Sequence, residues 1–169
     1  MKKIYIGLLC FFIIACNPEK RLIDKSNRLI EKLFQKTDTI YDCYVAFDDR
    51  RLIWYHDSTT LYGFVVKPFS IQKLQPVYCI NHLIDANSID ECFSTDFVNN
   101  DPCFQSSLDG VGVSMYVKNQ KRLSCSVHTE CLFSKEYPKN SFPFLLRQDL
   151  SLLNKAANKK NMKVYTINR

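Results

Sequence analysis

The first regular pattern in this chain is a helical one, over residues 17–36. Asn17 followed by Pro18 and Glu19 is typical of a helix start, because asparagine caps the free backbone N–H groups and proline fits the first turn. Apolar residues then recur at helical spacing, at Leu22, Ile23, Leu29, Ile30, Leu33 and Phe34. The pattern predicts an amphipathic helix that packs against a domain, with a membrane surface as the alternative neighbour.

From Ile40 the pattern changes to that of strands, rich in β-branched and aromatic residues. Residues 41–47 and 52–55 are apolar runs on either side of a charged tip and predict a hairpin. Residues 61–67 predict a third strand, ended by Pro68, and residues 77–80 a short fourth.

The second half predicts two helices and three strands. Ser88 with Glu91 forms a capping box and predicts a short helix to about residue 99. Residues 111–117 and 123–127 alternate between apolar and polar, which predicts an antiparallel hairpin with one buried face. A second long helix is predicted from Pro143, and a closing strand over residues 164–167.

This order of elements predicts the fold class. Helices do not alternate regularly with strands, so a mostly antiparallel sheet is expected, in the α+β class. The sheet is accompanied by an N-terminal helix, a short middle helix and a long C-terminal helix. No repeat or linker divides residues 16–169, which we expect to form a single domain.

Residues 1–15 have the pattern of an export signal. Lys2 and Lys3 precede an apolar run over residues 4–15. Its length is well below the roughly 20 residues that a membrane-spanning helix needs. We therefore expect a signal peptide that is removed.

The end of this segment resembles a bacterial lipoprotein signal. Ile13, Ile14 and Ala15 correspond to the lipobox, and Cys16 to the lipid acceptor. The resemblance implies cleavage before Cys16 and acylation with chains such as palmitate. It implies a lipid anchor in the bacterial cell envelope, with the membrane as a partner. Asn17 in place of aspartate implies outer-membrane delivery in a host with two membranes.

Charge adds little to this picture. Removing residues 1–15 takes away Lys2 and Lys3 and leaves 21 basic against 17 acidic residues, a net charge of +4. Acidic and basic residues are interspersed, so no nucleic-acid partner is expected.

Six cysteines remain once Cys10 is removed and Cys16 is lipidated. An even number in an exported chain predicts disulfides, and Cys92 with Cys103 is a plausible local pair. The alternative is buried free thiols. The candidate disulfide cysteines are Cys43, Cys79, Cys92, Cys103, Cys125 and Cys131.

The spacing Cys125, His128, Cys131, with Cys79 and His82 as a second pair, offers possible zinc ligands. Exported thiols tend to oxidise, and Cys125 and His128 would face opposite sides of a strand. We therefore predict no metal site and no cofactor.

Aromatic residues are the best candidates for binding. They crowd the first three predicted strands and could grip a protein or a glycan, although aromatic residues also fill cores. The candidates are Tyr41, Tyr44, Trp54, Tyr55 and Tyr62.

Known hydrolase motifs such as G-x-S-x-G are absent, so no catalytic residue is predicted and enzymatic activity is left open. The preferred hypothesis is a lipid-anchored binding or interaction domain stabilised by disulfides. One alternative is a small envelope hydrolase that uses His56, His82 or His128. The other is a structural or assembly lipoprotein of a larger envelope complex.

Overall fold

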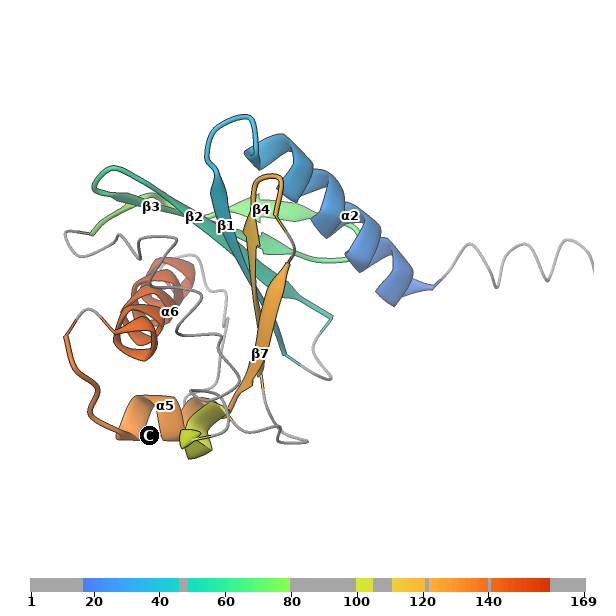
Figure 1. The fold of residues 1–169 in the computed structure, drawn as a ribbon. Coiled ribbons are helices and arrows are strands. Elements are labelled where there is room, and N and C mark those ends of the chain that lie inside the picture. The colour runs from blue at the N-terminus through green and yellow to red at the C-terminus, as the bar shows by residue number, and fades with distance from the viewer. Residues whose placement is uncertain are drawn as a thin grey trace, which may run out of the picture.

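Two helices cover opposite faces of one antiparallel sheet (Figure 1). Helix α2 (Pro18–Leu33) lies on one face, and helix α6 (Phe142–Asn158) lies on the other. The arrangement is that of a computed structural model. It describes residues 17–45, 49–79, 100–104, 111–120, 122–139 and 141–158.

The sheet has the strand order β4-β3-β2-β1-β6-β7, and β5 also pairs with β3. Every described pair is antiparallel. The strands are β1 (Thr39–Val45), β2 (Arg51–Asp57), β3 (Thr60–Val66), β4 (Ile71–Lys73), β5 (Val77–Tyr78), β6 (Val111–Val117) and β7 (Leu123–Val127). A 3-10 turn, η1 (Pro102–Phe104), precedes β6, and a short helix, α5 (Thr129–Ser134), follows β7.

The predicted start of α2 is confirmed. The Asn17 side chain accepts a hydrogen bond from the Lys20 backbone N–H at 3.1 Å, and Pro18 is the first helical residue. The apolar stripe of the helix packs on β2 and β3. Together they form a small core of Leu22, Leu29, Ile30, Leu33, Ile40, Ile53, Tyr55 and Val66.

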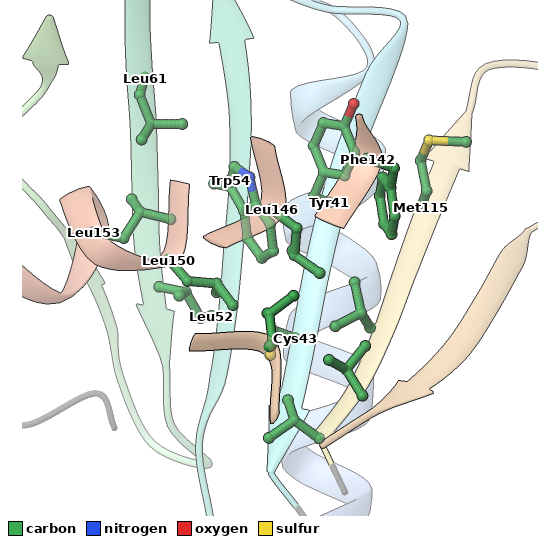
Figure 2. Packing of buried hydrophobic residues seen from close by; sticks show 14 of the residues in the cluster. Tyr41, Cys43, Leu52, Trp54, Leu61, Met115, Phe142, Leu146, Leu150 and Leu153 are labelled. Carbon is green, nitrogen blue, oxygen red and sulfur yellow. The ribbon is translucent and has the colours of Figure 1, made fainter. Parts of the chain in front are cut away.

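The larger core lies under α6 (Figure 2). Leu146, Leu150 and Leu153 recur at helical spacing and are buried against the sheet. Trp54 and Leu52 point toward them from β2, because residues two apart on a strand share a face. Adjacent residues of β2 therefore belong to different cores, and this explains why β2 is buried from Arg51 to Tyr55.

The first hairpins differ in detail from the sequence prediction. Strand β2 extends beyond the predicted residues 52–55 through His56 and Asp57, and the turn falls at Ser58. Ser58 has φ of 48°, a left-handed turn conformation. Strand β4 was not predicted, since its three residues are all exposed and carry no periodic signal.

The fold class is confirmed: an antiparallel sheet with an N-terminal, a short middle and a long C-terminal helix. The short helix predicted over residues 88–99 and the strand over 164–167 lie outside the described residues. Helix α5 was not predicted. Its residues continue directly from an alternating strand, so periodicity did not mark the change.

Gly63 on β3 is required by the close approach of α6. A Cβ atom built there would overlap Leu153 Cδ2 and lie 3.0 Å from Leu74 Cδ1. We expect Gly63→Ala to lower the free energy of unfolding by about 1 to 2 kcal/mol, measured by urea unfolding. Gly112→Ala is the matched control, because its Cβ would meet nothing closer than the Tyr44 carbonyl oxygen at 3.6 Å. Equal unfolding free energies for the two variants would contradict this packing argument.

Candidate functional site

Two polar clusters stand out in the described residues, one on each face of the sheet. On the α6 face, Asp149 is a buried acidic residue with 7% of its surface exposed. Its Oδ2 accepts a hydrogen bond from Trp54 Nε1 at 2.9 Å and lies 2.7 Å from His56 Nε2. We call Asp149, Trp54 and His56 the Asp149 cluster. It joins the middle of α6 to β2.

Cys79 lies close to this cluster, just after β5. The ligand atoms of His56, Cys79 and Asp149 lie within 4.8 Å of one another, and Gln148 Nε2 is 3.4 Å from the Cys79 sulfur. Thiolate, imidazole and carboxylate are all zinc ligands. However, the 2.7 Å between His56 and Asp149 is a direct hydrogen-bond distance, so an ion would have to separate these two side chains. The geometry is that of a hydrogen-bonded connection between helix and sheet.

The Tyr41 ring packs against the other members of the Asp149 cluster. Its ring stacks on Trp54, with centroids 5.4 Å apart, and meets His56 edge-on at 6.2 Å. Burial, reinforced by the negative charge of Asp149, raises the pKa of the Tyr41 hydroxyl. The Tyr41 hydroxyl therefore stays neutral, and the ring contributes packing beside Trp54 and His56.

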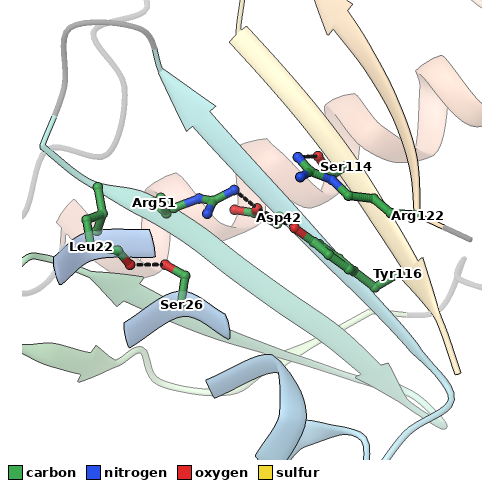
Figure 3. A network of polar contacts seen from close by, with 7 residues as sticks. All are labelled: Leu22, Ser26, Asp42, Arg51, Ser114, Tyr116 and Arg122. Atoms are coloured by element: carbon green, nitrogen blue, oxygen red, sulfur yellow. Dashed lines mark hydrogen bonds and ion pairs between the residues drawn. The ribbon is translucent and has the colours of Figure 1, made fainter. Parts of the chain in front are cut away.

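The second cluster, on the face of the sheet that α2 partly covers, surrounds Asp42 (Figure 3). The Arg51 guanidinium forms an ion pair with the Asp42 carboxylate, and the Tyr116 hydroxyl donates to the same oxygen at 3.3 Å. Arg122 donates to the Ser114 hydroxyl at 2.5 Å. The residues come from β1, β2 and β6, with Arg122 just before β7, and alternation places the strand residues on one face.

Asp42 is almost fully buried, and two effects on its pKa oppose each other. Burial raises the pKa of this carboxyl, whereas Arg51, Arg122 and the Tyr116 hydroxyl lower it. A buried carboxylate needs such partners, because an isolated charge in the protein interior is very costly. Arg51 and Arg122 therefore stabilise the buried carboxylate as well as carrying positive charge on this face.

A cavity of about 340 Å³ opens beside these arginines. We call it the arginine pocket. Its polar lining comprises Tyr44, Arg51, Ser114, Arg122, Ser124 and Ser126.

None of the hydrogen-bonding pairs in either cluster was predicted. One signal was present in each case: Asp149 interrupts a leucine stripe, and Asp42 lies within an apolar strand.

The candidate cysteines differ in bonding and burial. Cys103 and Cys131 form a disulfide that joins η1 to α5, with 28 residues of sequence separation. The expected Cys92–Cys103 pair is therefore wrong. Cys43 and Cys79 are buried, and Cys125 is a half-buried free thiol. Cys16 and Cys92 lie outside the described residues.

The zinc alternative built on Cys125, His128 and Cys131 is excluded by the disulfide, which takes Cys131. His128 is instead the N-cap of α5, where its Nδ1 accepts from the Cys131 backbone N–H at 3.3 Å. His82 lies outside the described residues. Of the two histidines that the structure describes, His56 is the one whose side chain pairs with an acidic residue.

The candidate aromatics do not share one binding face. Tyr41 and Trp54 are buried in the core under α6. Tyr55 stacks on Tyr62 at 5.0 Å on the α2 face, and Tyr44 lies beneath the Arg51 guanidinium, 5.8 Å from its ring centroid. Of the five, only Tyr44 lines the arginine pocket.

Cys125 on β7 supplies a test of burial on the α6 face of the sheet. Burial raises the pKa of its thiol to about 12. Because only the thiolate reacts, we expect alkylation by iodoacetamide at neutral pH to be about a thousandfold slower than in the unfolded chain. The rate should rise about tenfold per pH unit until the thiol titrates. Peptide mapping of the alkylated sites measures this, and rapid labelling at neutral pH would show that the thiol is not buried.

Comparisons with protein-family models, curated proteins and solved structures found no match to this chain. In the part of the chain that the structure describes, no helix has both the length and the apolar character needed to cross a membrane.

Proposed function

We propose that this chain is an exported bacterial lipoprotein whose α+β domain is held in the cell envelope through Cys16 and binds a partner there. The observation that carries the proposal is the lipobox-like run Ile13, Ile14, Ala15 and Cys16, after a short apolar segment with a basic start. Two or more acyl chains give stable anchoring without a membrane-spanning helix.

The start of the domain supports a position close to the bilayer. Asn17, the residue after the proposed lipid site, already caps α2, so little flexible chain separates the helix from the lipid. Near this end of α2, the Arg21 guanidinium lies 5.2 Å from the ring centroid of Phe69, which is 73% exposed. Basic and exposed aromatic side chains together favour contact with anionic head groups and the membrane interface.

Intact mass and peptide mapping of membrane-extracted protein test the anchor. We expect the mass of residues 16–169 plus acyl chains on Cys16, and a Cys103–Cys131 peptide that separates on reduction. The Cys16→Ser variant should lack the acyl mass and should no longer be found in the detergent-soluble lipoprotein fraction. An unmodified Cys16 in the wild-type chain would refute the proposal.

Partner binding needs a separate test. Chemical cross-linking in intact cells, followed by purification, should recover a partner with the wild-type chain. The recovery should fall with Cys16→Ser, because that variant is not held at the membrane. Identical cross-linked products from the two chains would count against binding in the envelope.

A further inference from the structure

We propose that the arginine pocket binds an oxyanion, specifically a phosphate group. This inference names a ligand class for the proposed binding domain, but its chemistry does not depend on the lipid anchor. The pocket lies over β1, β6 and β7, and two guanidinium groups line it, from Arg51 and Arg122.

The fold fixes the position of Arg51 before any ligand binds. Its side chain is nine-tenths buried and is held by the ion pair with Asp42. Its Nε is buried and has no hydrogen-bond partner among the described residues. Because the fold fixes the position of this side chain before any ligand arrives, little conformational freedom is lost on binding.

Arg122 provides the accessible charge. It is exposed, yet its position is restrained by the hydrogen bond to Ser114 and by the Tyr116 ring, whose centroid lies 5.3 Å from its guanidinium carbon. Guanidinium groups bind phosphate through paired, charge-assisted hydrogen bonds, and they remain protonated at all relevant pH values.

Hydroxyl groups complete the donor set. Ser124 and Ser126 are two apart on β7 and therefore share a face, and their register partners on β6 are Ser114 and Gly112. Gly112 has no side chain, which leaves space between Tyr44 and Ser126.

The charge balance favours an anion. Arg51 and Arg122 are among the residues that line the pocket, and no acidic residue is among them; Asp42 is buried and paired with Arg51. The volume of about 340 Å³ is at the lower end of the range for small-ligand sites, which suits a phosphate group with a small substituent.

The test measures binding of inorganic phosphate to the purified full chain in a non-ionic detergent by isothermal titration calorimetry. We expect binding to the wild-type chain and a loss of about tenfold or more in affinity for Arg122→Gln, because a charge-assisted donor is removed. Gly112→Val should abolish binding by filling the pocket, and it suits a strand. Lys155→Gln, on the exposed side of α6, is the control and should bind as the wild type does.

Arg51 is left unchanged, because removing it would leave the buried Asp42 carboxylate without its ion-pair partner and destabilise the fold. Absence of phosphate binding to the folded wild-type chain would overturn the proposal. Equal affinities for the wild type, Arg122→Gln and Gly112→Val would also overturn it, because they would place the phosphate elsewhere.

The phosphate group can belong to a soluble ester or to a lipid headgroup, and a second arm separates these sources. The lipidated chain is reconstituted in phosphatidylcholine vesicles with and without phosphatidylglycerol. A weaker apparent phosphate affinity of the wild-type chain in the anionic vesicles, with a smaller change for Arg122→Gln, identifies the headgroup as the competitor. An unchanged affinity assigns the pocket to a soluble phosphate. Failure of Cys16 acylation would refute the anchor and leave the calorimetric result unaffected.

Discussion

Replacing Asp149 with alanine is expected to lower the free energy of unfolding by about 3 to 5 kcal/mol. The substitution removes the acceptor of Trp54 Nε1 and the partner of His56 Nε2 at the same time. Trp54 is fully buried, so its N–H would stay unsatisfied in the folded state. Urea unfolding followed by tryptophan fluorescence measures the loss, since Trp54 is the only tryptophan in the chain.

Two variants control this experiment. Asp149→Asn keeps one acceptor oxygen and should cost less than Asp149→Ala. Lys155→Ala, on the exposed side of the same helix, should change the free energy of unfolding by about 0.5 kcal/mol or less. If Asp149→Ala were as mild as Lys155→Ala, the Asp149 cluster would contribute nothing to the attachment of α6.

The second large effect is expected from the disulfide. Replacing both Cys103 and Cys131 by serine should lower the free energy of unfolding by about 3 to 4 kcal/mol, because a loop of this length restricts the unfolded chain strongly. Urea unfolding of the wild-type and variant chains, each with and without a reductant, measures this loss of stability.

The reductant itself provides the control. Reduction should destabilise the wild-type chain by a similar amount and leave the double serine variant unchanged. Cys125→Ser, which changes a thiol outside the disulfide, should retain the sensitivity to reductant. A wild-type unfolding midpoint that does not respond to reduction would contradict the assignment of Cys103 and Cys131 as a bonded pair.

Some cysteine positions illustrate the limit of sequence reasoning. An even cysteine count in a chain expected to be exported predicted disulfides, but nearness in sequence favoured the wrong partner for Cys103. The bond to Cys131 depends on η1 and α5 meeting in space, as their contacts and the backbone hydrogen bond from His128 N–H to the Cys103 carbonyl show. Such long-range pairing has no local pattern.

The aromatic residues illustrate the same limit. Their number in β1 to β3 was visible, yet alternation sends Trp54 to one face and Tyr55 to the other. Because helices cover both faces, neither set forms an open aromatic surface. Two covered faces cannot be inferred from a strand that is merely rich in apolar residues.

What the sequence determined by itself is local: the capped start of α2, the alternating hairpin of β6 and β7, the leucine stripe of α6 and the α+β class. These follow from periodicity and capping, which act over a few residues. Only the tertiary structure decided that Asp149 meets Trp54 and His56, and that Arg51 and Arg122 share a pocket. Those contacts join residues far apart in the chain, and they exist because the sheet and its two helices place them together.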